Sequence, residues 1–296
     1  MKRILITGAN SYIGISVESW LKAENIKQGE EFYFVNTLDM YGESWKQYDF
    51  SGYDVVFHVA GLAHADTGHV TEEKKEFYYK INTDLVVKTA EKAKTEGVKQ
   101  FIFMSSMIIY GGCKARVITQ KTSPRPANFY GESKWKADVQ IQGLADKNFR
   151  VVILRPPMIY GKGSKGNYPR LAKLATKTPL FPKVHNQRSM LYIDNLCQFV
   201  KLVIDNEESG VFFPQNGEYT NTSELVRLIA LARGHRVWLL PGLEWLIKML
   251  MLIPGKYGAM AGKIFGDSIY EMEMSEYKQN YRVCDFKSSI KATEEI

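Results

Sequence analysis

The chain has 296 residues, of which 45% are apolar and 24% charged, and this composition is typical of a globular protein and excludes a disordered one. Its formal net charge of +7 is compatible with phosphorylated small molecules, nucleic acid or an acidic membrane surface. Because the basic residues are interspersed with acidic ones and form no tract, we expect no nucleic-acid partner. The three cysteines lie far apart without a C-x-x-C pair, which argues against a disulfide framework or a zinc site and favours a reducing compartment.

Short apolar runs alternate with helical periodicity through the first half of the chain. The apolar runs predict strands at residues 2–7, 32–38, 54–59, 100–104 and 151–154. The helical periodicity predicts helices at residues 13–24, 77–94 and 130–144. In the first of these helices we expect Val17, Trp20 and Leu21 to be buried. The alternation predicts an α/β fold, in which a parallel sheet carries helices on both faces.

After Arg155 the pattern changes, because prolines and glycines mark a loop-rich region. Further helices are predicted at residues 169–176, 194–206 and 223–233, with a short strand at 211–214. We interpret this part as a smaller, interleaved carboxyl-terminal α/β domain that covers the carboxyl edge of the sheet. The first domain would comprise residues 1–160 with contributions from about 185–215, and the second mainly residues 161–296.

No signal peptide is expected, because the apolar start at residues 4–6 runs directly into a Thr-Gly pair. The longest apolar stretch, residues 243–253, contains Glu244 and Lys248 and is shorter than the ~20 residues that span a bilayer. It is either a buried helix or a helix that lies on the cytoplasmic membrane surface, assisted by nearby lysines. We therefore predict a cytoplasmic protein and keep peripheral membrane contact through residues 243–265 as the second interpretation.

Residues 7–14 (TGANSYIG) lie between the first predicted strand and the first predicted helix. The unpaired N–H groups and the dipole at a helix start attract anions, and in α/β folds a dinucleotide pyrophosphate binds at this place. Gly8 allows the tight turn, and Gly14 lets the helix pack against the strand. The segment therefore predicts a dinucleotide site.

Tyr130 and Lys134 lie four residues apart in a predicted helix, so they share one of its faces. Asn128, just upstream, is a candidate cap for the start of that helix. A free tyrosine has a pKa near 10, which is too high for a base at neutral pH. The neighbouring lysine ammonium and a positively charged nicotinamide would both favour the phenolate, which makes Tyr130 a candidate general base.

Three segments together resemble the extended short-chain dehydrogenases/reductases, the family of nucleotide-sugar epimerases and dehydratases. The glycine loop is similar to their TGxxGxxG motif, residues 104–111 (MSSMIIYG) to their SSxxxYG segment, and residues 130–134 (YGESK) to their catalytic pair. The resemblance implies a Rossmann-type doubly wound sheet with a NAD or NADP cofactor and no metal. It also implies catalysis by Tyr130, Lys134 and Ser106, whose hydroxyl would bind the reacting oxygen.

The loop departs from the family motif at the middle glycine, which is Ser11. A Cβ at this position restricts the backbone and would hold the pyrophosphate farther away, although the Ser11 hydroxyl could compensate with a hydrogen bond. The loop residues that the resemblance assigns to the cofactor are Gly8, Asn10, Ser11, Tyr12, Ile13 and Gly14.

Asp39 follows the second predicted strand, where an acidic side chain would bind the ribose 2′-hydroxyl and select NAD. If Asn36 or Thr37 occupies that place instead, NADP remains open. Asp49 and Phe50 resemble the family's pair that brackets the adenine. The remaining cofactor contacts implied by the resemblance are Val59, Ala60, Gly61, Asn82 and Pro156. The neighbouring His58 is interpreted as a structural histidine.

Residues 188–195 (RSMLYIDN) resemble the stretch of nucleotide-sugar enzymes in which an arginine grips the substrate diphosphate. Arg188 is therefore the principal substrate ligand implied, and a planar, bidentate cation suits a diphosphate. Asn167 and Lys162 are further candidates for phosphate or nucleotide contacts. The implied partner is a nucleotide-linked hexose of the UDP type.

Met107 and Ile108 stand where the 4,6-dehydratases of this family carry Asp-Glu, and neither side chain transfers protons, so a dehydratase is disfavoured. Two reactions at C4 of the sugar remain open: 4-epimerisation, and reduction of a 4-keto sugar in surface polysaccharide biosynthesis. A non-catalytic NAD(P)-binding protein is a third hypothesis. Relatives commonly dimerise through the helices that correspond to residues 77–94 and 130–144, which predicts a homodimer.

Overall fold

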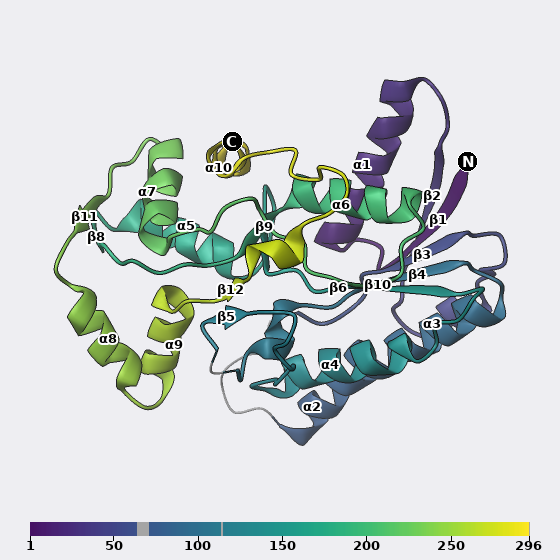
Figure 1. Cartoon of the computed structure of the whole chain (residues 1–296), viewed down its shortest axis with the longest axis horizontal. Coiled ribbons are helices and arrows are strands. Elements are labelled where there is room, and N and C mark those ends of the chain that lie inside the picture. Colours follow the sequence, from purple (N-terminus) through teal and green to yellow (C-terminus); the bar gives the residue numbers. More distant parts are fainter. Residues whose placement is uncertain (64–70, 114, 296) are drawn as a thin grey trace.

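A computed structural model describes residues 1–63, 71–113 and 115–295 of the chain. Six parallel strands form its central sheet in the order β10-β6-β4-β3-β1-β2 (Figure 1). The strands are β1 (Lys2–Thr7), β2 (Tyr33–Leu38), β3 (Val55–His58), β4 (Gln100–Met104), β6 (Arg150–Leu154) and β10 (Gly210–Phe212). Most of their side chains are buried, as expected for strands covered on both faces, and the predicted α/β fold is confirmed.

Adjacent residues of β1 face two separate cores, because successive side chains of a strand point to opposite faces. Ile4 packs with α1 and α6, whereas Leu5 packs with α3 and α4. Figure 1 accordingly shows α1 and α6 on one side of the sheet and α3 and α4 on the other. These flanking helices are α1 (Tyr12–Gln28), α3 (Leu85–Thr95), α4 (Phe129–Gln142) and α6 (Ile193–Asp205).

Two sequence-based expectations differ in detail from the structure. The helix expected at residues 77–94 consists of α2 (Glu72–Tyr79), a π-helical turn η2 (Lys80–Asp84) and α3. The widened turn buries Asn82, and the spacing of apolar residues gives no sign of it. Trp20 is half-buried rather than buried, because its indole N–H reaches Gln198 Oε1 at 3.3 Å.

Segments mainly from the second half of the chain, together with β5, build a smaller lobe beside the sheet (Figure 1). Its described strands pair as β5 with β12, β7 with β9 and β8 with β11. The strands are β5 (Val117–Ile118), β7 (Met158–Tyr160), β8 (Leu180–Pro182), β9 (Met190–Tyr192), β11 (Trp238–Leu240) and β12 (Ile269–Tyr270). The helices are α5 (Asn167–Lys177), α7 (Thr222–Ala232), α8 (Glu244–Leu252), α9 (Lys256–Phe265) and α10 (Phe286–Glu294). Short 3-10 turns complete the fold: η1 (Ser44–Gln47), η3 (Met107–Tyr110) and η4 (Met272–Ser275).

The helices α8 and α9 form a hairpin at one end of the molecule (Figure 1). A buried helix was the first interpretation of residues 243–253, and it is wrong. In α8 the side chain of Ile247 is buried, and the other side chains of the helix are partly or fully exposed. Apolar content alone predicted the helix but not whether other elements cover it.

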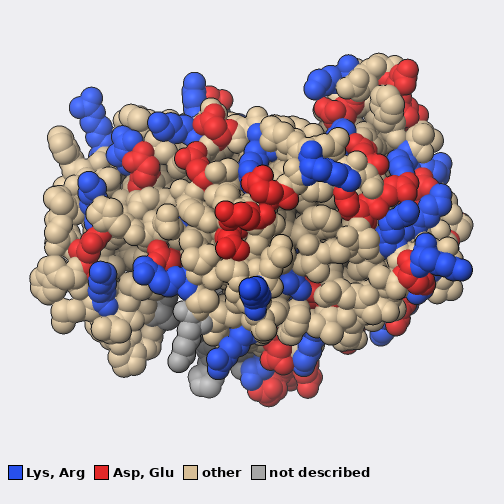
Figure 2. Space-filling view, in the orientation of Figure 1, with Lys and Arg blue, Asp and Glu red and all other residues tan. Residues whose placement is uncertain are grey.

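Charged side chains of both signs are intermixed on the face shown in Figure 2. Ion pairs along one helix include Lys22 with Glu18 at 2.7 Å and Lys201 with Asp205 at 2.8 Å. The end of this face where the α8–α9 hairpin projects is mostly uncharged (Figure 2).

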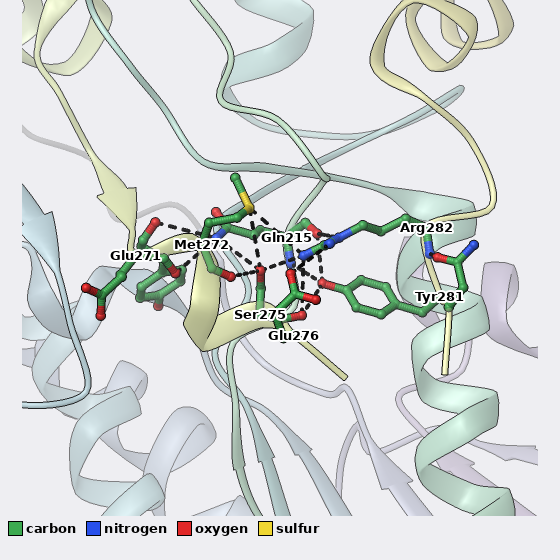
Figure 3. A network of polar contacts seen from close by, with 9 residues as sticks. Gln215, Glu271, Met272, Ser275, Glu276, Tyr281 and Arg282 are labelled. Carbon is green, nitrogen blue, oxygen red and sulfur yellow. Dashed lines mark hydrogen bonds and ion pairs between the residues drawn. The ribbon is translucent and has the colours of Figure 1, made fainter. Parts of the chain in front are cut away.

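A polar network attaches the chain before α10 to the rest of the lobe (Figure 3). The Tyr281 hydroxyl donates to the carbonyl of Gln215, which lies after β10, at 2.8 Å. The Arg282 guanidinium donates to Ser275 Oγ at 2.7 Å and pairs with Glu276 at 3.1 Å. The network therefore joins three segments that are distant in sequence and fixes the path of the carboxyl-terminal segment.

Candidate active site

The loop between β1 and α1 requires glycine at its first turn. Gly8 has a φ of +112°, and a Cβ added to it would lie 2.7 Å from the backbone nitrogen of Ala60. Any other residue would therefore clash with the chain after β3. Asn10 takes the left-handed region with a φ of 66°, which asparagine tolerates better than most residues.

Ser11, which replaces the family's middle glycine, has φ −74° and ψ 143°, angles that any residue adopts. Its hydroxyl accepts from the backbone N–H of Gly14 at 3.0 Å and caps α1. The structure shows this hydroxyl accepting in the helix cap, and a hydrogen bond from it to the pyrophosphate stays a prediction. The side chain therefore imposes no backbone restriction of the kind the sequence suggested.

Tyr12 and Ile13 begin α1 and pack against the core shared with α6. The Tyr12 hydroxyl turns towards the smaller lobe, since a Cβ added to Gly161 would lie 2.5 Å from it. Burial raises the pKa of the Tyr12 phenol well above its usual value. Tyr12 thus joins the start of α1 to the second lobe.

The ends of β2 and β3 lie directly beside the glycine loop. The Leu38 carbonyl accepts from the backbone N–H of Gly8 at 2.8 Å, which places Asp39, the next residue, at the loop. Asp39 is exposed and accepts from the backbone N–H of Tyr41 at 2.9 Å. Asn36, the alternative, donates to the Tyr53 hydroxyl at 2.7 Å. Of these two, Asp39 is the residue that the structure brings to the carboxyl edge.

The segment after β3 forms the other wall of the loop. The backbone N–H groups of Val59 and Ala60 both donate to the Thr7 carbonyl at 3.0 Å. His58 is fully buried, and its Nδ1 lies 2.8 Å from Thr7 Oγ1. Burial, together with the charge of Lys134, lowers the His58 pKa to about 3, so the ring is neutral and serves as a structural histidine.

Asp49 and Phe50 are not brought to this edge. Phe50 is fully buried, and its backbone N–H donates to Glu96 at 2.6 Å, just after the end of α3. The helix α3 starts at the carboxyl edge of the sheet and ends near the first residues of β4. Because Phe50 contacts the residue just after α3, Asp49 and Phe50 lie towards the amino ends of the strands. The sequence motif had suggested an adenine contact, but a fully buried ring at the opposite edge cannot provide it, and both residues are left out of the proposed cofactor site.

Tyr130 and Lys134 occupy the first turns of α4, and the predicted cap is present, since Asn128 Oδ1 accepts from the backbone N–H of Gly131 at 2.9 Å. The Tyr130 ring packs edge-on against Tyr78 of α2, with ring centroids 6.1 Å apart. Burial, with a smaller contribution from Tyr78, raises the Tyr130 pKa to about 12. We expected the lysine to favour the phenolate, but in the protein alone the Tyr130 pKa is shifted the other way, by burial.

Lys134 is buried, and its Nζ donates to the Met104 carbonyl at 3.0 Å, at the end of β4. Burial lowers the Lys134 pKa to about 8, and the charge of Asp138 opposes this shift. A Cβ added to Gly61 would lie 3.1 Å from this Nζ and 3.0 Å from Asn82 Oδ1. The ammonium, the asparagine and the chain after β3 therefore meet at one point.

Asn82, in the π-helical turn η2, holds the chain after β3 beside the residues of α4. Its Oδ1 accepts from the backbone N–H of Leu62 at 2.8 Å, and its Nδ2 donates to the Leu62 carbonyl at 3.1 Å and to Ser133 Oγ at 3.3 Å. Asn82 thus ties the segment after Gly61 to the residue before Lys134. The cofactor contact that the resemblance implies for Asn82 stays a prediction, and what the structure shows is its support of the chain around Lys134.

Ser106 begins the turn η3 after β4, and its hydroxyl accepts from the backbone N–H of Ile108 at 3.2 Å. The start of α4 packs on the same turn, since a Cβ added to Gly131 would lie 2.9 Å from the Ile108 carbonyl. The carbonyl of Pro156 accepts from the backbone N–H of Met107 at 2.9 Å. The structure thus brings together the turn of Ser106, the start of the tyrosine helix and the chain after β6.

One buried group beside Lys134 was missed by the sequence analysis. Asp138, one turn farther along α4, forms a two-point ion pair with Arg155, with N···O distances of 2.9 Å. Ser105 Oγ also donates to Asp138, at 3.0 Å, and Arg155 donates to the Tyr110 hydroxyl at 2.7 Å. The signal was present, since Asp138 follows Lys134 by four residues and Arg155 ends an apolar strand.

The two predicted substrate ligands differ in their surroundings. Arg188 Nη1 donates to the carbonyls of Lys263 and Gly266 at the end of α9, and burial lowers the pKa of its guanidinium. Asn167 is exposed at the start of α5. The structure therefore places Arg188 against the hairpin and Asn167 on another element of the smaller lobe.

Known proteins resemble this chain in sequence. The sequence model of the NAD dependent epimerase/dehydratase family matches residues 4–213. The UDP-glucose 4-epimerase of Vibrio cholerae is 31% identical over 288 residues, covering 90% of this chain and 83% of that protein. The N-acetyl-alpha-D-glucosaminyl-diphospho-ditrans,octacis-undecaprenol 4-epimerase of Escherichia coli O157:H7 is 28% identical over 220 residues, covering 70% of this chain and 64% of that protein.

Solved structures share the fold. A dTDP-4-dehydrorhamnose reductase from Clostridium acetobutylicum superposes with a TM-score of 0.72 at 20% identity, covering 98% of each chain. A UDP-glucuronic acid 4-epimerase from Bacillus cereus, in complex with NAD, gives a TM-score of 0.67 at 16% identity, covering 98% of this chain and 96% of that one.

The fold and the site are those of a dinucleotide-binding α/β protein. The chain belongs to the NAD dependent epimerase/dehydratase family, which confirms the predicted resemblance and a NAD or NADP cofactor. The residues present fit such a cofactor, because the turn at Gly8 leaves no room for a Cβ and the capped start of α1 faces the same edge. Asp39, Val59 and Ala60 lie around that turn.

Proposed function

We propose that the protein is an epimerase that acts at C4 of a hexose carried on a nucleoside diphosphate. The observation that supports it most is the meeting of Lys134, Asn82 and Gly61 at the edge formed by the glycine loop. This contact fixes the helix of Tyr130 against the wall of the cofactor site. A tyrosine at that place suits proton transfer at a sugar oxygen beside a hydride acceptor.

The chain's own residues have distinct roles in this proposal. A bound NAD(P) would supply reversible hydride transfer at the sugar carbon, held by the glycine loop and the chain after β3. Tyr130 takes the proton of the C4 hydroxyl as the hydride leaves and gives it back on reduction. Lys134 holds positive charge near the phenol, and Ser106 donates a hydrogen bond to the reacting oxygen.

Epimerisation is favoured over net reduction by the relative from Vibrio cholerae, which is named a UDP-glucose 4-epimerase and aligns with 90% of this chain. The side chains at Met107 and Ile108 provide no acid or base, which argues against dehydration as a third outcome. A diphosphate-linked sugar is common to both curated relatives, and the guanidinium of Arg188 is the proposed ligand of that diphosphate.

The test is turnover of a panel of UDP-hexoses, combined with mass spectrometry of nucleotides released from the purified protein. We expect tightly held NAD⁺ and interconversion of C4 epimers without added cofactor, because an epimerase keeps the hydride between its half-reactions. A requirement for NADPH with net reduction of a 4-keto sugar would replace this proposal by the reductase. Bound cofactor without any turnover would favour the non-catalytic hypothesis.

Tyr130→Phe is the matched variant for the chemistry. We expect kcat to fall by about 10²–10⁴-fold, since the phenol hydroxyl is the proton-transfer group. Cofactor content should remain that of the wild type, because the ring that packs on Tyr78 is kept. Full turnover in this variant would exclude Tyr130 as the acid and base.

We also propose a homodimer through α2, α3 and α4. Phe77 on α2 and Val139 on α4 are 50% and 49% exposed, so both helices present apolar side chains to the surface. Light scattering after size exclusion should give twice the chain mass of 33.8 kDa, and Val139→Glu should yield the monomer. A monomeric wild type would disprove the dimer.

A further inference from the structure

Large apolar side chains gather on the outer surface of the α8–α9 hairpin. Trp245, Met249 and Leu252 follow one another at helical spacing, so they form one stripe along α8. Trp245 is 60% exposed and Leu252 83% exposed. The exposed apolar residues of the hairpin are Trp245, Leu246, Met249, Leu250, Leu252, Ile253, Tyr257 and Met260. Soluble proteins rarely expose a continuous apolar surface of this kind unless something binds to it.

The charge of the hairpin indicates what binds there. Residues 244–265 contain three lysines and one acidic residue, Glu244. Glu244 pairs with His185 at the start of α8, away from Leu252 at its other end. The hairpin that carries the exposed apolar stripe also carries the exposed lysines Lys248 and Lys263, a combination that matches the boundary between acyl chains and anionic headgroups of a lipid bilayer. Among the described residues, no helix is long and apolar enough to cross a membrane, so the contact would be peripheral.

The inner side of the same hairpin lines a cleft. A hollow of about 540 Å³ lies between Ile247, Met251 and Phe265 on the hairpin and Cys113 and Arg116 on the segment after η3. The turn η3 itself begins next to Ser106, the proposed catalytic serine. One helical hairpin therefore presents an apolar surface outwards and a wall of this cleft inwards.

We propose that the α8–α9 hairpin docks on the surface of an anionic bilayer and brings the cleft to sugar diphosphates carried by membrane lipids. The substrate part of this inference rests on the proposed C4 chemistry, whereas the docking does not. A lipid-linked sugar diphosphate has an apolar tail beyond its phosphates, and a docked stripe would bring the cleft to the surface that holds such tails. A soluble nucleotide sugar has a polar base at that end and gains nothing from the stripe.

The first test is sedimentation of the full chain with vesicles of phosphatidylethanolamine and phosphatidylglycerol. We expect the wild type to bind these vesicles, to bind less at high salt, and to bind poorly to phosphatidylcholine alone. Leu252→Glu should lower the partition coefficient about tenfold or more, since a leucine leaves the bilayer and a negative charge replaces it. Ile26→Glu is the matched control, because Ile26 is also 83% exposed but lies on α1, at the far end of the molecule (Figure 1).

The outcomes separate docking from chemistry. Absence of vesicle binding by the wild type, or equal losses for Leu252→Glu and Ile26→Glu, would overturn the docking. A change of oligomer size in Leu252→Glu, without vesicle binding by the wild type, would overturn it in favour of contact between two copies. Turnover of soluble UDP-hexoses, measured on the same preparations, reports on the proposed function independently, and Leu252→Glu should retain it. For Leu252→Glu we expect turnover of a vesicle-embedded polyprenyl diphosphate sugar to be lost, while turnover of soluble UDP-hexoses is kept. If the variant keeps its turnover of the embedded substrate as well, the substrate part of the proposal is overturned.

Discussion

The carboxyl edge of the sheet and the α8–α9 hairpin distribute their side chains in opposite ways. At the edge, ionisable groups are buried, as with Lys134, Asp138 and Arg155. In the hairpin, large apolar side chains such as Trp245 and Leu252 are exposed. A buried charge and an exposed apolar side chain contribute little to the folding free energy of the chain by itself. We interpret the edge as organised for the proposed chemistry within the chain, and the hairpin for the proposed contact outside it.

The largest effect on stability is expected from Asp138→Asn. This change leaves the buried guanidinium of Arg155 without its counter-charge, so we expect the free energy of unfolding in urea to fall by about 3–5 kcal/mol. Glu18→Gln breaks an exposed pair and is the control, with an expected change below about 0.5 kcal/mol. Equal effects of the two variants would mean that the edge gains nothing from its buried ion pair.

Lys134→Met should stabilise the protein while it removes activity. Burial lowers the Lys134 pKa to about 8, from 10.5, so the folded state disfavours the ammonium. This penalty is fully present below pH 8 and disappears as the pH rises towards 10.5, where the lysine is neutral in both states. We expect a gain of about 1–3 kcal/mol at pH 7 from chemical denaturation, shrinking as the pH rises. A difference that is independent of pH, or a loss of stability at pH 7, would contradict the assignment.

Ser11→Ala tests the helix cap at the same edge. Loss of the hydrogen bond to Gly14 should reduce the free energy of unfolding by about 1 kcal/mol, whereas Ser11→Gly should reduce it by a few tenths. Thermal unfolding of the two variants measures the difference. If the hydroxyl also bound the cofactor, both variants would lose cofactor affinity by tenfold or more, and the role assigned to Ser11 would then be incomplete.

The smallest effect is expected in the hairpin. Met249→Ser removes an exposed apolar side chain, so the free energy of unfolding should change by less than about 0.5 kcal/mol. Urea unfolding in the absence of lipid checks this value. A loss of 2 kcal/mol or more would show that Met249 packs within the fold, in which case the contrast between the two regions would not hold.

The local sequence pattern was sufficient to predict a structural element where the segment's own residues imply whether it is buried. The strand at residues 100–104 was predicted with its observed ends, because a short apolar run between helices has few alternatives. The positions of Gly8, Gly61 and Lys134 near one another also agree with the predicted parallel sheet, since the carboxyl ends of parallel strands share one edge.

The local sequence pattern was insufficient to predict a residue's place where that place depends on contact with a residue distant in the chain. The motif at Asp49 does not indicate which edge of the sheet it faces, and contact with Glu96 decides it. The helix at residues 244–252 is apolar whether or not other elements cover it. The sequence offers Asp138 and Arg155 as charged residues near the site, but their pairing joins a helix to a strand end and so depends on how the two elements pack.

The contact of Arg188 with the end of α9 would link two equilibria if Arg188 binds the diphosphate as proposed. The guanidinium donates to the carbonyls of Lys263 and Gly266, and an oxyanion bound by the same Nη1 must displace them. Anything that moves α9 away from Arg188 therefore raises its affinity for the oxyanion, and by thermodynamic reciprocity the oxyanion favours release of α9 to the same extent. Ligand capture and hairpin position would then act as one coupled switch.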